Sequence, residues 1–467
     1  MKHFKLVGIT CLLILLSCKT IKKKKTLSTV KQNVLFLMMD DLRPELSVFG
    51  QSQIISPNID ALAKSGVTFK RAYCNVPVCG ASRASILTGI RPTADRFLKY
   101  NASITKETPN ILTLVKHFKN QGYTTISNNK ITHLKRDIKE WDEEWYPYVK
   151  GWRDYQSKEN INLEKNGEHG YAYENPDIED AAYYDGKTAN ESILDLKRLK
   201  AEGNPFFMAV GFVKPHLPFN APKKYWDLYK ESEITLPKNN FFSESAPKIA
   251  NHSWGELRYY KDIPKKGQVS DAVAKKLIHG YYAAVSYVDA QVGKVLKELK
   301  NLGLKDNTVI VLVGDHGWSL MEHGLWVKHS NFEVALQVPL IISASNLPKD
   351  RRTNSIAELV DLYPTLCELA NISIPPHVDG ESLVKALQTP SKVFKNTALA
   401  RWQKGETLIA DNLFYTEWQR NDKTIARMLY DHSTDSDENR NLAMEASFKE
   451  TVDSLSTILN NRLKRTK

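Results

Sequence analysis

Three apolar runs place the strongest constraint on how this chain folds, because each run ends directly in ionisable residues. Asn33 to Met39 precedes Asp40-Asp41, Pro205 to Val213 precedes Lys214-Pro215-His216, and Thr308 to Val313 precedes Gly314-Asp315-His316. A run that is apolar at every position predicts a strand buried on both faces of a sheet. The carboxyl ends of parallel strands lie at one edge, where open α/β sheets keep their sites. We therefore expect these ionisable side chains to gather at one edge.

Segments of helical periodicity separate the strands. The expected helices are Ile59 to Ser65, Thr108 to Asn120 and Lys275 to Leu302, and the further expected strands are Val67 to Tyr73, Thr124 to Ser127 and Val338 to Ala344. Strands that alternate with helices predict an α/β fold with a mixed, mostly parallel sheet sandwiched by helices.

The pattern changes near residue 391, which predicts a main domain over 32–390 and a smaller α+β subdomain over 391–467. The subdomain is expected to hold strands at Thr397 to Trp402, Asn412 to Gln419 and Arg427 to Asp431, and a closing helix at Ala443 to Lys464. Residues 140–185 and 230–270 lack periodicity and are rich in Trp, Tyr, Asn and Lys. They read as long insertions that form the walls of a sugar-binding cleft.

The N-terminus predicts export. A basic start is followed by an apolar run from Leu6 to Leu16, and Leu15-Leu16-Ser17-Cys18 resembles a bacterial lipobox. This pattern predicts a signal peptide over 1–17, lipidation of Cys18 and a tether over 18–31. The alternative is a plain secretory signal. The lipobox places the protein on the cell surface or facing the periplasm of a Gram-negative bacterium, with a lipid anchor in the membrane.

Charge and cysteine content argue against a nucleic-acid-binding protein and against a small disulfide-stabilised protein. Seven lysines in the first 25 residues supply most of the formal net charge of +12 and leave +5 for the rest, which is no nucleic-acid footprint. The five cysteines are too few for a disulfide scaffold. Cys74 and Cys367 form either one disulfide or two buried free thiols.

The richest motif is Val78-Cys79-Gly80-Ala81-Ser82-Arg83, followed by Leu87-Thr88-Gly89. If Cys79 begins a helix, Arg83 lies one turn on and on the same face. The unpaired N–H groups of a helix N-terminus favour an anion such as sulfate. A buried cysteine beside a surface arginine is the plainer alternative.

Asp40, Asp41, Asp315 and His316 are candidate metal ligands. Three carboxylates with few soft donors suit a hard divalent cation, Ca²⁺ first and Mg²⁺ second. Taken separately, an acidic pair after a strand is often a helix cap, and Asp-His-Gly is often a turn.

Four further residues are candidates by position. Lys130 and His133 are three residues apart, so a tight loop turns both toward one ligand, and His216 and Lys328 follow other apolar stretches. Each, taken alone, is more often a solvated or satisfied polar group.

Together these motifs resemble the type I sulfatases of the alkaline-phosphatase superfamily, in the branch similar to iduronate-2-sulfatases. The resemblance runs from Asn33 to about Ile374 through Asp-Asp-Leu-Arg-Pro, Cys-x-Ala-Ser-Arg, Lys-Pro-His-Leu-Pro-Phe and Asp-His-Gly-Trp. It implies an alkaline-phosphatase-like fold and a formylglycine made from Cys79 by a formylglycine-generating or anaerobic sulfatase-maturing enzyme. One departure is Ala81, where many members have proline.

The resemblance also implies roles for the candidate residues. The metal ligands are Asp40, Asp41, Asp315, His316 and the modified Cys79. Arg83 and Lys130 hold the hydrated aldehyde, and His133 assists its regeneration. Lys130, His216 and Lys328 hold sulfate oxygens, and His216 protonates the leaving alcohol.

The implied reaction is hydrolysis of a sulfate ester on a carbohydrate. One hydroxyl of the aldehyde hydrate attacks sulfur, and the other later expels sulfate, which a serine cannot do. The branch suggests a uronate-containing oligosaccharide or polysaccharide, such as ulvan or glycosaminoglycan. The alternatives are a phosphodiesterase or phosphonate hydrolase of the same superfamily, and a non-catalytic lipoprotein that binds sulfated glycans.

Overall fold

A computed structural model describes residues 31–51, 53–147, 152–421 and 423–464. The predicted signal peptide, Cys18 and most of the tether lie outside these residues. Residues 32–467 form one compact unit, and the boundary predicted at residue 390 stays a prediction. Within the described ranges, the structure contains no helix both long and apolar enough to cross a bilayer.

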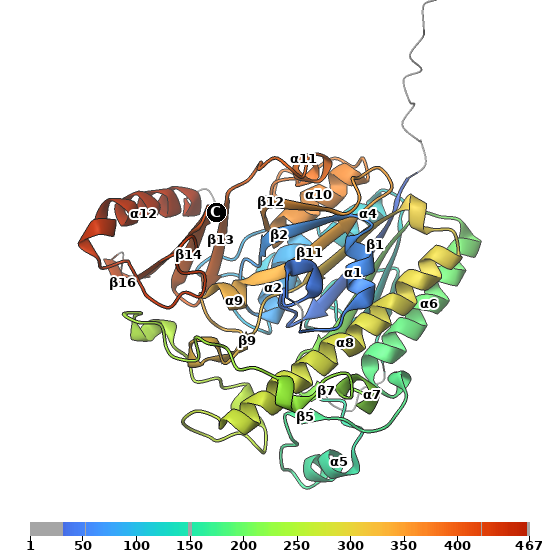
Figure 1. Cartoon of the computed structure of the whole chain (residues 1–467). Helices are drawn as coiled ribbons and strands as arrows, with labels where there is room; N and C mark the ends of the chain where they lie inside the picture. The colour runs from blue at the N-terminus through green and yellow to red at the C-terminus, as the bar shows by residue number, and fades with distance from the viewer. Residues whose placement is uncertain (1–30, 52, 148–151, 422, 465–467) are drawn as a thin grey trace, which may run out of the picture. The chain divides into compact units, whose positions relative to one another are not determined.

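A sheet of eight strands forms the centre of this unit (Figure 1). Its strands, in spatial order, are β12 (Arg351–Glu358), β2 (Val67–Tyr73), β11 (Gln337–Ser343), β8 (Thr308–Gly314), β1 (Asn33–Asp40), β6 (Phe206–Pro215), β3 (Thr124–Asn129) and β4 (Glu143–Trp145). Only β11 runs antiparallel to its neighbours β2 and β8. The predicted mixed, mostly parallel sheet is confirmed.

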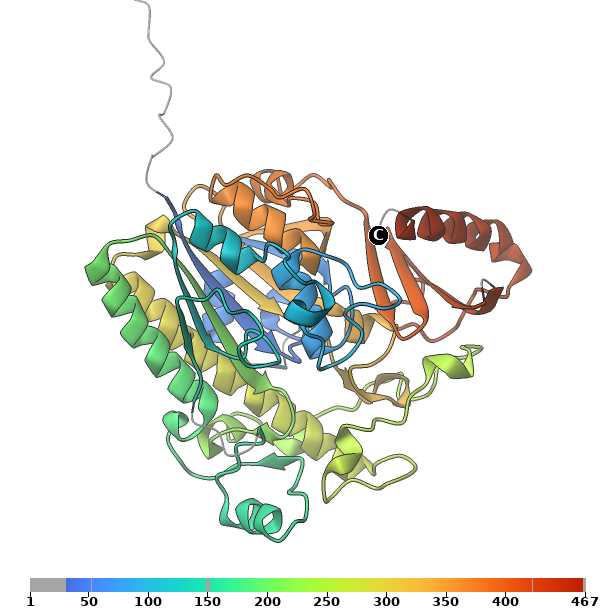
Figure 2. The same ribbon diagram turned by 180° about the vertical axis from the view of Figure 1, so that it is seen from behind.

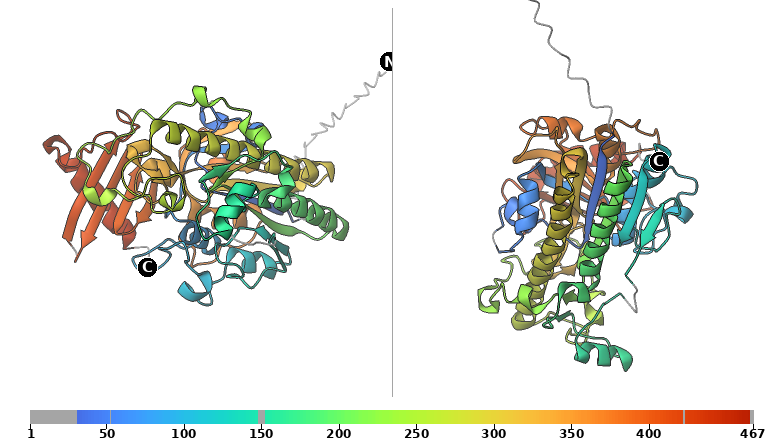
Figure 3. Two further views of the ribbon diagram at one scale, coloured as in Figure 1. Left: turned by 90° about the horizontal axis from the view of Figure 1, so that it is seen from below. Right: turned by 90° about the vertical axis from the view of Figure 1, so that its right-hand side faces the viewer.

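Helices cover both faces of the sheet, which explains the uninterrupted apolar runs. One layer holds α1 (Pro57–Ala63), α6 (Tyr184–Glu202) and α8 (Asp271–Asn301), seen at the front of Figure 1 and in the right panel of Figure 3. The other holds α2 (Cys79–Thr88), α4 (Leu114–Asn120) and α10 (Leu362–Leu369), seen from behind in Figure 2. Every residue of β1 is buried between these layers, as a doubly covered strand requires.

The insertions carry short elements at the edge of this sandwich. They include α5 (Lys158–Lys165) and β5 (Tyr173–Glu174), and β5 pairs with β7 (Phe219–Asn220), which precedes α7 (Lys223–Trp226) and the second insertion. Two shorter pieces precede α4 and β11, namely α3 (Ile104–Glu107) and α9 (Glu333–Leu336), and α11 (Val384–Gln388) follows α10.

The helix predicted over 108–120 is wrong in its first half. Thr108 follows α3 in a non-helical conformation, and Asn110 has φ 66°. Pro109 explains this break, because proline has no N–H and disfavours a helical residue before it. The helix begins only at Leu114, where the Thr113 side chain accepts a hydrogen bond from the Lys116 N–H.

The C-terminal part is a four-stranded antiparallel sheet with one helix packed on it. Its strands follow each other in order: β13 (Thr397–Trp402), β14 (Gly405–Ala410), β15 (Leu413–Arg420) and β16 (Lys423–Asp431). The sequence did not predict β14, and the closing helix α12 (Lys449–Leu463) is shorter than predicted because a 3₁₀ turn occupies residues 446–448. Cys74 and Cys367 are buried free thiols, so the predicted disulfide alternative is wrong.

One buried carboxylate connects this sheet to the main domain. Glu358, at the end of β12, is fully buried and pairs with Arg91 at 2.7 Å, Lys395 at 2.7 Å and Arg462 of α12 at 3.2 Å. Burial opposes its ionisation, but Lys395 and Arg91 hold the pKa of Glu358 well below its usual range. The three cations share this one anion, and Lys395 also pairs with Asp361 at 2.6 Å.

We expect Glu358→Gln to lower the free energy of unfolding at pH 7 by about 3 kcal/mol, because it removes the buried carboxylate that the three cations share. The matched control is Glu231→Gln, which removes a half-exposed pair with Lys276 and costs less than about 1 kcal/mol. Because the folded pKa is depressed, the wild-type advantage exists above the unfolded pKa of about 4.3 and shrinks as pH falls below it. Urea unfolding at pH 7 and pH 3 measures both effects, and a deficit that is equal at the two pH values contradicts this account.

Candidate active site

The predicted ionisable residues meet at the carboxyl ends of four adjacent strands. Asp40 ends β1, Asp315 and His316 follow β8, His216 follows β6 and Lys130 follows β3. The strand order β8-β1-β6-β3 makes these four ends neighbours. The Asp41 N–H donates to Asp315 Oδ1 at 3.2 Å, so the ends of β1 and β8 are joined directly.

Cys79 enters this cluster from α2, the helix that follows β2. All ten residues of α2 are buried, and Cys79 is its first residue. Its Sγ lies 3.2 Å from Nε2 of His316. Burial, and next the charge of Asp40, raise the pKa of the Cys79 thiol to about 11. The side chain at this position is therefore an uncharged thiol at neutral pH.

Arg83 fastens α2 to two of the strand ends. Its side chain is fully buried, and its Nε donates to Asp315 Oδ2 at 2.7 Å. Its Nη1 donates to the carbonyl oxygen of Lys130, and its Nη2 lies 3.8 Å from Asp40 Oδ2. This buried position is consistent with the prediction that Arg83 lies on the same helix face as Cys79. The alternative, in which Arg83 is a surface residue, is wrong.

Two lysines each pair with a buried aspartate. Lys130 Nζ contacts Asp40 Oδ2, and Lys328 Nζ lies 3.1 Å from Asp41 Oδ1. Burial lowers the pKa of Lys328, but Asp41 and the weaker contributions of its acidic neighbours together outweigh burial, so the net pKa is well above the usual range. Burial raises the pKa of Asp41 well above its usual range, because Lys328 only partly offsets the desolvation and the repulsion by Asp40. Lys328 alone therefore does not fully compensate an ionised Asp41.

His216 is held between two acceptors. Its Nδ1 lies 2.6 Å from the carbonyl oxygen of Leu217, and its Nε2 lies 3.0 Å from Oε1 of Glu256. Glu256 also contacts Lys328 Nζ at 3.0 Å through its other oxygen. Burial and the two lysines lower the pKa of His216, but Glu256 and Asp40 raise it above the usual value overall.

Glu256 is a site residue that the sequence did not reveal. It lies in the 230–270 insertion, outside any strand end or motif, so no periodicity or spacing pointed to it. Only the tertiary contacts with His216 and Lys328 identify it.

His133 is a neutral imidazole beside the cations. Burial, and next the charge of Lys130, lower its pKa to about 3. Its ring meets that of Tyr100 edge to face with 5.7 Å between centroids. A neutral imidazole keeps one ring nitrogen without a proton, which can accept a hydrogen bond, although nearby positive charge makes it a weak base.

The donor atoms fit a hard divalent cation. Ligand atoms of Asp40, Cys79, Asp315 and His316 lie within 4.8 Å of one another, as do those of Asp40, Asp41, Cys79 and His216. Both carboxylate oxygens of Asp40 are buried and accept no hydrogen bond in the described part of the chain, although Lys130 lies against them. A cation at this point satisfies the crowded carboxylates, so the residues present fit the predicted metal.

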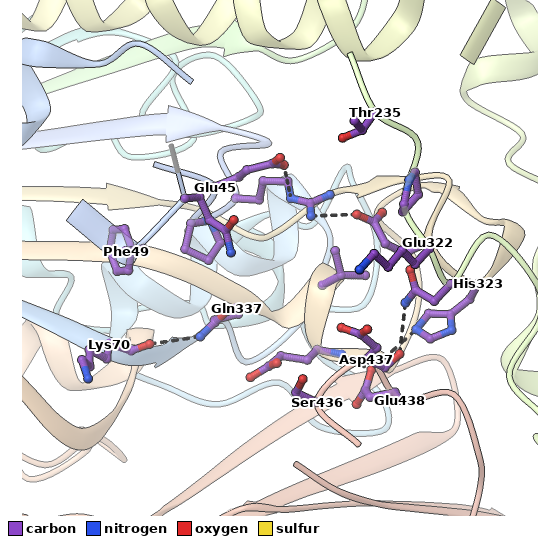
Figure 4. Close-up of a pocket in the computed structure, with 18 of the residues that line it drawn as sticks. Glu45, Phe49, Lys70, Thr235, Glu322, His323, Gln337, Ser436, Asp437 and Glu438 are labelled. Carbon is purple, nitrogen blue, oxygen red and sulfur yellow. Dashed lines mark hydrogen bonds and ion pairs between the residues drawn. The ribbon is translucent and has the colours of Figure 1, made fainter. Parts of the chain in front are cut away.

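A separate concavity of about 780 Å³ contains none of the predicted site residues (Figure 4). It lies between the main sheet and the C-terminal part, beside the hairpin of β9 (Ser319–Leu320) and β10 (Trp326–Val327). Part of its charge is paired internally, since Arg43 contacts Glu322 at 2.7 Å and Glu45 at 3.2 Å. We therefore place the candidate active site at the strand ends and not in this concavity.

Comparison with known proteins gives the family context. Residues 32–372 match the family model described as Sulfatase, and residues 321–465 match the one described as N-sulphoglucosamine sulphohydrolase, C-terminal. The iduronate 2-sulfatase of Mus musculus is 34% identical over 76% of this chain and 74% of its own length. A sulfatase of Formosa agariphila is 32% identical over 98% of this chain and 91% of its own length.

Solved structures share the fold at low identity. A protein solved in complex with its substrate D-glucosamine-2-N,6-O-disulfate has a TM-score of 0.76 at 20% identity, covering 94% of this chain and 98% of that one. The phosphonate monoester hydrolase of Silicibacter pomeroyi has a TM-score of 0.75 at 20% identity, covering 94% and 96%. The predicted fold class is confirmed.

The packing of α2 yields a prediction for Gly80. A Cβ at this position would lie 1.9 Å from the carbonyl oxygen of Tyr100, whereas one at Gly255 would meet nothing within 4 Å. Gly80→Ala is expected to lower the free energy of unfolding by about 1–3 kcal/mol, because backbone has to move away from the new methyl group. Gly255→Ala, the matched control, is expected to stay within about 0.5 kcal/mol. Equal stability of the two variants in urea unfolding would show that α2 tolerates displacement.

Proposed function

The chain belongs to the sulfatase family and is a sulfuric ester hydrolase, and from this we propose that it removes sulfate from a sulfated oligosaccharide or polysaccharide. The single observation that carries the proposal is the convergence of Cys79, three buried aspartates and the cationic side chains of Arg83, Lys130 and Lys328 at one edge of the sheet. A uronate-containing glycan such as ulvan or glycosaminoglycan is the proposed substrate. An ulvan-active sulfatase of Formosa agariphila, 27% identical over 96% of this chain and 84% of its own length, supports this class.

We propose that Cys79 acts only after conversion to formylglycine by a formylglycine-generating or anaerobic sulfatase-maturing enzyme. A thiol with a pKa of about 11 is almost wholly protonated at neutral pH and is a weak nucleophile. Formylglycine supplies a hydrated aldehyde, whose hydroxyl is the nucleophile of the family reaction. Arg83 and Lys130 orient the side chain at this position.

The proposed metal ligands are Asp40, Asp41, Asp315, His316 and the modified residue 79, with Ca²⁺ preferred over Mg²⁺. An oxygen-rich set with flexible geometry suits Ca²⁺. The ion supplies Lewis-acid stabilisation of negative charge on sulfate.

The remaining side chains bind sulfate and move protons. Lys130 and Lys328 present buried ammonium groups to an anion, and such preorganised charge is most effective where water is excluded. His216, whose pKa is raised, is the proposed donor to the leaving alcohol. His133, whose imidazole is neutral, is proposed to assist the step that restores residue 79.

The export signal belongs to the same proposal. Lipidation at Cys18 would hold the enzyme on the cell surface or facing the periplasm, where a bacterium meets polymeric glycans. The proposed partners are the glycan, the maturing enzyme and the membrane, with no nucleic acid.

The deciding experiment is a desulfation screen with enzyme matured in its own host or alongside a maturing enzyme. We expect release of inorganic sulfate from ulvan oligosaccharides or heparin-derived 2-O-sulfated disaccharides, with loss of at least a thousandfold in Cys79→Ala. Mass spectrometry of the residue 79 peptide should show the aldehyde. Cleavage of phosphonate or phosphate diesters with no sulfate release would favour the alternative hydrolase, and an unmodified thiol with tight glycan binding would favour a non-catalytic lipoprotein.

Metal binding has its own test. Ca²⁺ added to chelator-treated protein is expected to raise the melting temperature by several degrees, because it relieves repulsion among buried carboxylates. Asp315→Asn should weaken this shift, while Asp306→Asn, in an exposed turn before β8, should leave it unchanged. A melting temperature that does not respond to Ca²⁺, Mg²⁺ or Mn²⁺ would rule out a metal centre built from these residues.

A further inference from the structure

Two strongly exposed aromatic side chains lie beside the two histidines of the site. Trp152 is 47% exposed, and its ring meets that of His216 edge to face with 5.4 Å between centroids. Tyr100 is 63% exposed and meets His133 in the same manner. Within the described residues, Trp152 is the most exposed of the tryptophans. Large aromatic surfaces left in water usually mark a contact site.

Trp152 is held in place by its neighbour in the insertion. The guanidinium of Arg153 lies 4.8 Å from the centroid of the Trp152 ring, and Arg153 itself pairs with Glu164 at 3.1 Å. The carbonyl oxygen of Arg153 accepts a hydrogen bond from Asn220 Nδ2 at 2.8 Å. These contacts tie Trp152 to two other segments, so its exposed ring is an ordered surface.

Tyr100 is tied to the nucleophile end of the site. Its carbonyl oxygen packs so closely on Gly80 that only glycine fits there, and Gly80 follows Cys79. The Tyr100 ring then lies against His133. Trp152 therefore marks the His216 side of the site, and Tyr100 marks the side of Cys79 and His133.

We infer that Trp152 and Tyr100 form a saccharide-binding surface, in which the sugar ring that carries the leaving oxygen packs against Trp152. This inference rests on the proposed function, since His216 is the proposed donor to that oxygen and Trp152 contacts His216. A pyranose ring combines an apolar face of C–H groups with polar hydroxyls, which matches an exposed indole beside the guanidinium of Arg153 and the imidazole of His216. Aromatic rings provide large contact area at low entropic cost.

The test uses the matured full-length enzyme and four variants: Trp152→Ala, Trp152→Phe, Tyr100→Ala and Phe394→Ala. Phe394 is 47% exposed in the segment before β13 and serves as the control for removing an exposed aromatic ring. KM and kcat are measured on the ulvan and heparin-derived probes, and the inhibition constant is measured for inorganic sulfate, which has no sugar ring. Binding of the same probes to the Cys79→Ala background gives Kd without turnover.

We expect Trp152→Ala to raise KM and Kd for the saccharide roughly five- to thirtyfold, with kcat within about threefold. Tyr100→Ala should have a smaller effect of the same kind, Trp152→Phe should retain most affinity, and Phe394→Ala should change nothing. Inhibition by inorganic sulfate should stay within about twofold in Trp152→Ala, because the anion does not contact the indole.

Two results would overturn the inference. One is saccharide KM and Kd within twofold of wild type in both Trp152→Ala and Tyr100→Ala. The other is a parallel loss of inorganic sulfate affinity, which would show that Trp152 only supports His216. Sulfate release from 4-nitrocatechol sulfate by the wild type reports the proposed chemistry separately. If it persists while the saccharides do not bind, the surface is refuted and the sulfatase activity stands.

Discussion

Neutralisation of three buried carboxylates is the requirement on which the rest of the structure depends. Asp40, Asp41 and Asp315 are fully excluded from solvent at the ends of two adjacent strands. Leaving such groups uncompensated costs several kcal/mol each. The fold meets this cost by bringing Arg83 from α2 and two lysines from β3 and the β10 hairpin. The cations proposed to bind sulfate are thus also those that stabilise the folded site.

The charged groups of the site also influence the protonation states of the side chains around residue 79. The carboxylates disfavour a thiolate, since Asp40 adds to burial in raising the pKa of Cys79. Burial, and next Lys130, keep His133 neutral, while Glu256 and Asp40 favour the charged form of His216. The pKa values of the two histidines are therefore shifted in opposite directions by their different surroundings. Lys130 thus acts on His133 while it also pairs with the buried Asp40.

The sequence predicted the strand ends well and the insertions poorly, for a physical reason. The runs that precede Asp40, Asp315 and His216 are so apolar that they predict strands buried on both faces of a sheet. Parallel pairing of these strands then brings their carboxyl ends together. The half-wrong helix at 108–120 shows that Pro109 outweighs amphipathic spacing. Glu256 and Trp152 have no such local signal, because their positions depend on contacts with His216 and Lys328, which lie 40 to 72 residues away along the chain.

These contacts give the core and the insertions different roles in the site. The sheet and α2 supply Cys79, Arg83 and the aspartates, so the charge balance there permits little variation. The insertions reach the site through His216: Trp152 contacts its ring, and Glu256 its Nε2. Glu256 adds negative charge beside Lys328 and so weakens the attraction of the site for an anion. This loss is offset only if the carboxylate also orders these side chains or accepts a hydrogen bond from a hydroxyl of the sugar. Substrate choice can therefore change in the insertions while the chemistry of the sulfate ester stays with the core.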